Sequence, residues 1–337
     1  MTDDSPRWAG LDGLRAIAVL LVLWLHACYA GYLTAPWWFP YSGRLGVSLF
    51  FVLSGYLITR LLLQEAERHG RIDLKKFYIR RCLRIFPPYY LYLLVLVLIP
   101  FLGARPTDPI GLLLAASYCL NLTSAHRDHN IEHTWSLCYE EQYYLFWPAA
   151  LLLLGKRRAT FLALGVVVGW PILRILKAGH LAFSPALMLQ STAFDTLMMG
   201  SSLALLTADQ RPGRRTALTM LAAVGLILGM YAGQAFIPES LAVLIPTVRD
   251  LCLAWIVWWC VSNPGHPLVR VLDTPWMVGL GAISYSLYLW HPLFLQAHDG
   301  PLPHGWQSWV AVGLATMLSY RLVEVPLQRW RARWRPA

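Results

Sequence analysis

The chain has 337 residues, of which 57% are hydrophobic and only 14% are charged. Soluble domains carry about 25% charged residues, so this composition excludes an ordinary soluble globular protein and indicates an integral membrane protein. Sixteen tryptophans and sixteen tyrosines fit the aromatic belts found where membrane helices meet the two bilayer surfaces. The formal net charge of +10 indicates membrane orientation and contact with anionic membrane lipid, and we expect no nucleic-acid partner.

Hydrophobic runs long enough to cross about 30 Å of hydrocarbon recur along the whole chain. The sequence therefore predicts an all-α integral membrane protein with about ten transmembrane helices. We expect one transmembrane domain over residues 1–337, with no appended soluble domain. The expected spans are residues 11–31, 45–63, 87–103, 137–155, 159–176, 191–207, 216–236, 247–263, 276–297 and 307–325.

One further apolar piece, Ile110–Leu122, has about 13 residues, which is short for a crossing. If this piece crossed the bilayer, Lys156, Arg157 and Arg158 would face outward. If it instead lies at the surface or re-enters between helices, most of the 28 lysines and arginines fall on one side, which marks that side as cytoplasmic. We therefore expect a short re-entrant or interfacial segment in a multi-pass protein of the cell (inner) membrane, with both termini in the cytoplasm.

The first predicted span, LDGLRAIAVLLVLWLHACYAG, is apolar after its start apart from His26. On a helix, Arg15 and His26 would lie about 16 Å apart on nearly the same face. Asp12 lies one turn before Arg15 and can pair with it. Ionisable groups inside a membrane cost about 2.5–3.5 kcal/mol or more, so by default they face the protein interior and mark function. The alternative is that His26 only hydrogen-bonds a neighbouring helix.

Two further segments offer ligand-binding residues. In the second span, Ser54 and Gly55 either let helices approach closely or leave room for a bound ligand. In the basic segment that follows, Arg81 and Arg84 would share a helix face, with Arg80 as a third cation. Guanidinium groups bind phosphate bidentately, so this cluster suits a phosphate. The alternative is a segment that only sets topology and contacts lipid headgroups.

The remaining polar groups of interest lie in the outer halves of their spans. Glu140 and Glu141 point about 100° apart on a helix, so at most one of them is expected to face the bundle interior. A carboxylate that orients an imidazole makes it a better base, which would allow Glu140 to act with His26. Alternatively, both glutamates are solvated residues at a helix start, where acids are favoured. His291 lies before Pro292 at a similar depth in the ninth span, where it either orients His26 or only caps or kinks its helix. Asp195 opens the sixth span as an acid without an obvious partner.

Several stretches match a known family in the correct order: LDGLRAIAVLLVLWLH, GVSLFFVLSGYLIT, IFPPYY after the arginine pair, TWSLCYEEQYYLFWP, ISYSLYLWHPL and LVEVP. Through them the chain resembles acyltransferase family 3, a family of membrane O-acyltransferases, along nearly its whole length. The resemblance implies a ten-helix domain that takes an acyl group, usually acetyl, from cytoplasmic acyl-CoA. The acyl group would pass to a hydroxyl of a carbohydrate, such as a polysaccharide or lipid-linked sugar, or of a macrolide-type acceptor.

The resemblance also implies roles for individual residues. His26 would be the catalytic imidazole and Arg15 its partner in the motif. Arg81 and Arg84 would bind the donor, acetyl-CoA, and Glu140 would be the acid of the tryptophan-containing motif. Cys138–Tyr139 departs from the family pattern, in which small or aliphatic residues precede the glutamates. With these assignments we group Arg15, and Ser54 from the residue pattern of the second span, with Arg81 and Arg84 as expected donor-binding residues.

A mechanistic hypothesis follows, in which acyl-CoA docks with its phosphates at the arginine pair and its pantetheine arm reaches the imidazole. His26 then acts as general base or is itself transiently acylated, and Glu140 or His291 orients it. No zinc spacing and no phosphate-cradling glycine loop is present, and we expect no metal. A transporter or flippase of a glycan or lipid-linked sugar is the competing class. It would be expected to show inverted repeats, and no two halves of the chain resemble each other.

Overall fold

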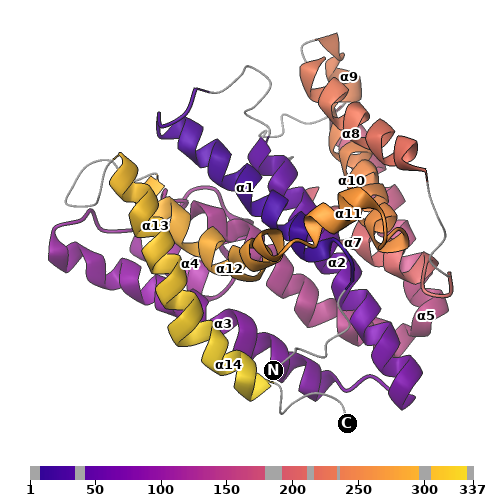
Figure 1. Ribbon diagram of the computed structural model, residues 1–337, viewed down its shortest axis with the longest axis horizontal. Coiled ribbons are helices and arrows are strands. Elements are labelled where there is room, and N and C mark those ends of the chain that lie inside the picture. The colour runs from indigo at the N-terminus through magenta and orange to yellow at the C-terminus, as the bar shows by residue number, and fades with distance from the viewer. Residues whose placement is uncertain are drawn as a thin grey trace. The chain divides into compact units, whose positions relative to one another are not determined.

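The computed structural model describes residues 8–34, 42–178, 192–210, 216–233, 236–295 and 305–331. Within these ranges every regular element is a helix (Figure 1), so the all-α prediction is confirmed. The longer helices are α1 (Leu11–Tyr29), α2 (Ser42–His69), α3 (Leu74–Leu98), α5 (Trp135–Ala178), α7 (Thr192–Leu206), α8 (Ala217–Ala232), α10 (Ile245–Ser262), α12 (Pro275–Leu295) and α13 (Trp306–Ser319). The short ones are α4 (Pro109–Ala116), α9 (Glu239–Ala242), α11 (Pro267–Leu272) and α14 (Val325–Arg331).

By length and composition, seven helical segments of the described chain can cross a membrane. One of them, Glu132–Leu176, has 45 residues, more than twice the length that about 30 Å of hydrocarbon requires. Gly155 lies inside it with φ 69° and ψ 167°, so the helix kinks between the two spans that the sequence predicts there. Helices α7 and α8 have only 15 and 16 residues, which is short for a span. The number of ten crossings therefore stays a prediction.

The chain divides into two compact units. The first unit comprises residues 1–21, 37–60 and 160–282, and the second comprises residues 22–36, 61–159 and 283–337. Helices α1, α2, α5 and α12 each contribute residues to both units. The single domain over residues 1–337 stays a prediction.

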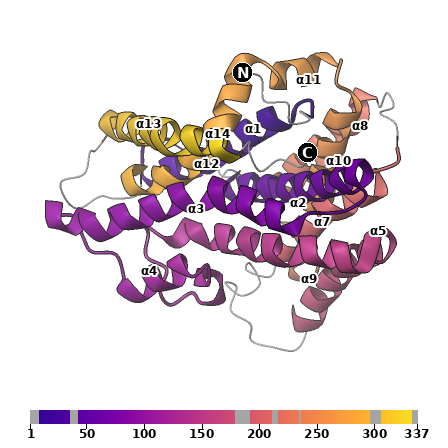
Figure 2. The same ribbon diagram turned by 90° about the horizontal axis from the view of Figure 1, so that it is seen from below.

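In the first unit, α10 packs against α7 and α8, and the three helices lie side by side in both views (Figures 1 and 2). Helix α2 crosses α7 at very short range. A Cβ built on Gly55 would lie 2.0 Å from the carbonyl oxygen of Leu197, and one built on Gly200 would lie 2.1 Å from that of Val52. Gly55 thus serves close helix packing, which was one of the two alternatives for this position.

Gly55→Ala is expected to lower the free energy of unfolding by about 1–3 kcal/mol, because the added methyl group overlaps a backbone carbonyl and forces two packed helices apart. The matched control is Gly165→Ala, since Gly165 is also helical but, apart from its own helix backbone, no described atom lies within 4 Å of its would-be Cβ. We expect the control to be neutral or slightly stabilising, because alanine favours helix. Thermal unfolding of the purified variants in detergent measures both. Equal stability of the two variants would contradict the packing interpretation.

In the second unit, α3 packs against α14, and the two helices lie side by side in both views (Figures 1 and 2). The predicted short segment is folded against α3 as well. Helix α4 has only eight residues, too few to cross a bilayer. The hydroxyls of Tyr89 and Tyr90 donate to the carbonyls of Ala115 and Ala116 at 2.9 and 2.8 Å, and Tyr118 stacks on Tyr89 with ring centres 4.7 Å apart. Because Tyr89 and Tyr90 lie inside the predicted span 87–103, this packing favours the re-entrant alternative.

Candidate functional site

Helix α1 is unbroken from Leu11 to Tyr29, so Arg15 and His26 lie on one helix, as predicted. Arg15 Nη1 is 3.3 Å from Asp12 Oδ1, which confirms the predicted ion pair one turn apart. Arg15 and Ser54 belong to the first unit, whereas His26 belongs to the second. The sequence-predicted residues Arg81, Arg84 and Glu140 also belong to the second unit.

His26 contacts two groups through the same ring nitrogen. Its Nδ1 lies 2.9 Å from the carbonyl oxygen of Val22, one turn earlier, and 3.3 Å from Nε2 of His291 on α12. A carbonyl oxygen can only accept, so we assign the proton of neutral His26 to Nδ1. His291 Nδ1 lies 3.2 Å from the carbonyl oxygen of Leu287 and carries its proton for the same reason. His291 Nε2 is therefore an acceptor for the Nδ1–H of His26.

This assignment leaves Nε2 of His26 with a free lone pair. Both hydrogen-bond contacts of His26 within the described residues involve Nδ1. The His291 ring is fully buried and meets the His26 ring edge to face, with centres 4.6 Å apart. A fixed Nδ1–H and an open Nε2 are what a general base or a nucleophilic imidazole requires. His291, which the sequence offered as one of two orienting groups, is the one in contact with His26.

Glu140 lies among different neighbours. It is within electrostatic range of Arg81, as Glu141 is, and of Tyr285 and Tyr288 on α12. The guanidinium carbon of Arg81 lies 4.4 Å from the ring centre of Tyr144 on α5, a cation–π contact. Arg81 of α3 therefore lies on the ring of Tyr144 and within electrostatic range of both carboxylates near the start of α5, all in the second unit.

Arg80 does not extend the Arg81–Arg84 pair. Its Nη2 lies 3.1 Å from Oε2 of the buried Glu65, and Oε1 of Glu65 accepts from the backbone N–H of Asp73 at 2.9 Å. Glu65 thus fixes the turn between α2 and α3. Asp73 caps α3 by accepting from the backbone N–H of Lys76 at 3.0 Å, and this hydrogen bond lowers the pKa of Asp73. The idea of Arg80 as a third phosphate-binding cation is therefore not supported by its contacts.

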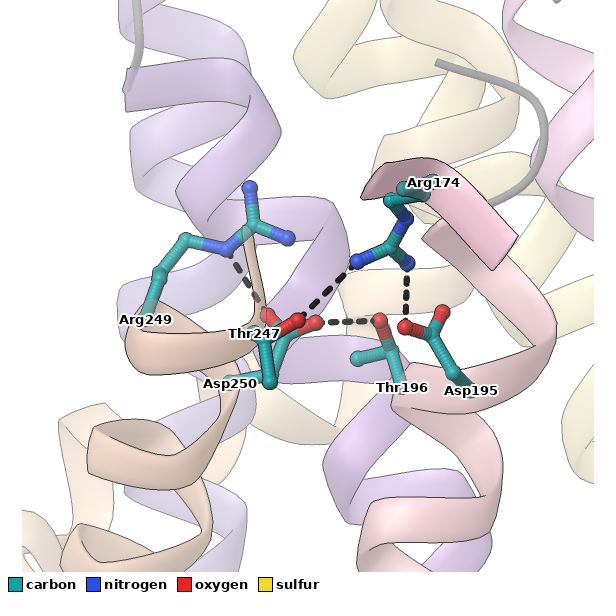
Figure 3. A network of polar contacts seen from close by, with 6 residues as sticks. All are labelled: Arg174, Asp195, Thr196, Thr247, Arg249 and Asp250. Atoms are coloured by element: carbon teal, nitrogen blue, oxygen red, sulfur yellow. Dashed lines mark hydrogen bonds and ion pairs between the residues drawn. The ribbon is translucent and has the colours of Figure 1, made fainter. Parts of the chain in front are cut away.

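A second polar cluster lies in the first unit (Figure 3). It consists of four charged side chains, none more than about a tenth exposed: Arg174, Asp195, Arg249 and Asp250. Arg174 pairs with Asp195, and Nε of Arg249 lies 2.7 Å from Oδ1 of Asp250. Thr196 Oγ1 donates to Asp250 Oδ2 at 2.5 Å and so links the α7 and α10 parts of the cluster. Asp195, for which the sequence showed no obvious partner, pairs with Arg174, and both arginines of the cluster are buried in ion pairs.

Comparison with known proteins adds the decisive finding. A family model described as an acyltransferase domain, of acyltransferase family 3, matches residues 8–320. The chain belongs to this acyltransferase family. The resemblance inferred from the separate motifs is therefore confirmed.

The acyltransferase is similar to several curated bacterial proteins. A protein of Staphylococcus aureus (strain COL) named for O-acetyltransferase activity is 30% identical over 97% of this chain and 59% of its own length. The peptidoglycan O-acetyltransferase OatA of Listeria monocytogenes is 29% identical over 95% of this chain and 55% of its own. The O-acetyltransferase OatA of Staphylococcus aureus (strain NCTC 8325 / PS 47) is 28% identical over 96% and 58%. The chain thus spans little more than half the length of these relatives, and no solved structure matches it.

Sequence reasoning missed one residue that the acyltransferase fold brings to His26 and His291. His133 lies on the short turn Glu132–Thr134 before α5, and its ring centre is 5.7 Å from that of His291. The signal available was weak, because a histidine just before a span is easily assigned to the outer segment. In the described part of the chain, no group of His, Cys, Asp and Glu side chains is arranged to hold a metal ion.

Proposed function

We propose that this acyltransferase moves an acetyl group from cytoplasmic acetyl-CoA to a hydroxyl of a carbohydrate, with His26 as the catalytic imidazole. The observation that carries the proposal is the His26 geometry, in which Val22 and His291 hold the Nδ1 proton and Nε2 stays open. Three curated relatives are named O-acetyltransferases, one of them for peptidoglycan. A polysaccharide acceptor such as peptidoglycan therefore stands ahead of a lipid-linked sugar or a macrolide-type product, and family membership favours an enzyme over a transporter.

The donor would lie along α3 and α5, with its phosphates at the arginines. Arg84 pairs with no carboxylate among the described residues and is free to bind a phosphate. Arg81 instead contacts the ring of Tyr144 and lies within electrostatic range of Glu140 and Glu141. Tyr144, which contacts Arg81, follows His133 by eleven residues. Arg81 and the histidines around His133 are therefore about 16 Å apart along α5. That separation is roughly the length of the pantetheine arm, which joins the phosphates of acetyl-CoA to its thioester. Arg15 and Ser54 belong to the first unit, and their assignment to donor binding stays a prediction from the sequence.

The proposed transfer steps follow from the tautomer of His26, which carries its proton on Nδ1 and a lone pair on Nε2. Nε2 of His26 takes the proton of the acceptor hydroxyl while the hydroxyl oxygen forms a bond to the acetyl carbon. The carbon–sulfur bond breaks, and the proton passes from Nε2 to the sulfur of the departing CoA. In the other route, Nε2 itself attacks the thioester carbon, the carbon–sulfur bond breaks and CoA departs as the thiolate. The acceptor hydroxyl then attacks the acetyl carbon, the bond to Nε2 breaks, and the hydroxyl proton neutralises the thiolate. In both routes His291 is a positioning residue, and Glu140 acts through Arg81.

The proposal also implies in which membrane the protein lies and how it is oriented there. The acyl donor is made in the cytoplasm, and most basic segments are expected on the cytoplasmic side. We therefore place the protein in the cell inner membrane, with both termini cytoplasmic and lipid around its apolar helices. Of the basic residues behind this orientation, Arg7, Arg211, Arg214, Arg215, Arg333 and Arg335 lie outside the described residues.

Arg84→Ala is expected to raise KM for acetyl-CoA about 10- to 100-fold, the equivalent of one lost hydrogen bond to a charged group, about 1.5–3 kcal/mol. KM for the carbohydrate acceptor should stay within about twofold. Steady-state kinetics of the purified protein, with each substrate varied in turn, measures both constants. The matched control is Arg71→Ala, which removes an exposed arginine before α3. Equal increases in KM for donor and acceptor would argue against a donor site at Arg84.

A further inference from the structure

The backbone of His133 is held unusually firmly for a residue between a loop and a helix. The hydroxyls of Ser136 and Tyr288 each lie 3.0 Å from the carbonyl oxygen of His133 and 2.7 Å from each other. Three residues earlier, Tyr92 on α3 donates its hydroxyl to the carbonyl of Asn130 at 2.5 Å. Side chains of α3, α5 and α12 therefore fix this turn from different directions.

The imidazole ring of His133, unlike its backbone, is not held by strong hydrogen bonds. The residue is only 5% exposed. The backbone of Leu289 lies within reach of a weak hydrogen bond to the ring, but among the described residues neither Nδ1 nor Nε2 has a partner that meets full hydrogen-bond geometry. An unsatisfied buried donor or acceptor costs about 1–3 kcal/mol, and nearly all buried polar groups in proteins are paired. A fixed backbone around an unsatisfied ring is typical of a group that is arranged to bind something else.

The neighbours of this ring indicate what it binds. The rings of His26, His291 and His133 form a chain, with centres 4.6 Å and 5.7 Å apart. Tyr92 and Tyr288 each place a ring 5.5 Å from that of His133. An uncharged N–H donor thus lies near the proposed catalytic imidazole, in surroundings of low polarity where a hydrogen bond to a developing charge is strong.

We propose that the N–H of neutral His133 binds the carbonyl oxygen of the acetyl group and stabilises the oxyanion of the tetrahedral intermediate. This inference rests on the proposed function. As the acceptor oxygen bonds to the acetyl carbon, the carbonyl electron pair moves onto its oxygen and is stabilised by His133. It returns when the carbon–sulfur bond breaks and CoA leaves with the proton from His26. His133 neither gains nor loses a proton, as expected of a neutral imidazole that acts as an electrophile.

The competing explanation is that His133 only fills space among aromatic rings. Two variants separate the explanations. His133→Phe keeps the volume without the donor, and His133→Gln keeps an N–H donor. Removing one oxyanion donor costs about 10²–10³ in kcat, so we expect that loss in His133→Phe with KM for acetyl-CoA within about threefold of wild type. His133→Gln should recover at least about tenfold of the loss.

The test uses the purified full chain, with thermal unfolding and acetyl-CoA binding measured for every variant. His129→Phe, at an exposed position of the same outer segment, is the matched control and should keep wild-type kcat. Full activity in His133→Phe overturns the inference, as does an equal loss in both His133 variants accompanied by a lower unfolding temperature. If wild-type protein transfers no acetyl group from acetyl-CoA, the proposed function fails as well, and this outcome is distinct from the other two.

Discussion

His26→Gln is expected to lower kcat for acetyl transfer by about 10²–10⁴, the usual contribution of a general base. Glutamine is close to histidine in size and polarity, but its side-chain amide cannot act as a base near neutral pH. The purified variant should still bind acetyl-CoA, because the proposed donor contacts lie at Arg84 and along α5. Release of free CoA thiol in the presence of acceptor measures kcat, and equilibrium binding measures the donor affinity.

Two further variants make this prediction specific. His69→Gln removes an exposed histidine at the end of α2 and should leave kcat unchanged. His291→Phe should give an intermediate loss, because the Nδ1–H of His26 keeps the carbonyl of Val22 but loses its second acceptor. A folded His26→Gln protein with wild-type kcat would refute the assignment of the catalytic imidazole.

Arg174→Met is expected to destabilise the protein by about 3–5 kcal/mol, the usual cost of removing one partner from a buried ion pair. The variant would leave the buried carboxylate of Asp195 without its cation (Figure 3). The double variant Arg174→Met with Asp195→Leu should recover much of this loss, because apolar replacement of a complete buried pair is often nearly neutral.

Thermal unfolding in detergent, followed by the loss of monomeric protein on size exclusion, measures this series. Arg158→Met removes an exposed arginine from the same helix and serves as the control, with an expected change within about 0.5 kcal/mol. If the single and double variants at Arg174 and Asp195 were equally unstable, the pair would not behave as a coupled buried unit.

Local features of the fold could be predicted from the sequence. The Arg15–Asp12 pair was predictable because three residues along a helix fix the contact whatever surrounds it. The all-helical architecture follows from hydrophobic runs, since backbone groups inside a bilayer must be satisfied within the segment. The number of membrane crossings could not be predicted as directly, because hydrophobic runs do not show where a helix kinks or ends. α5 joins two predicted spans through a kink at Gly155, and the described parts of α7 and α8 have only 15 and 16 residues.

Contacts between distant parts of the chain could not be predicted in this way. His26 and His291 are 265 residues apart, and only the packing of α1 and α12 in the second unit brings them together. The sequence therefore left open whether His291 or Glu140 orients the imidazole. The pairing of Arg80 with Glu65 and of Arg174 with Asp195 was hidden for the same reason, since charge patterns show which residues need partners but not which partners they obtain.

The central claim is tested most directly by incubating the purified full chain with acetyl-CoA labelled in the acetyl group and with peptidoglycan fragments as acceptor. The account predicts that free CoA thiol and alkali-labile labelled acetate on the glycan appear together, and that both disappear in His26→Gln. Wild-type protein that binds acetyl-CoA but releases no thiol and labels no glycan would contradict it.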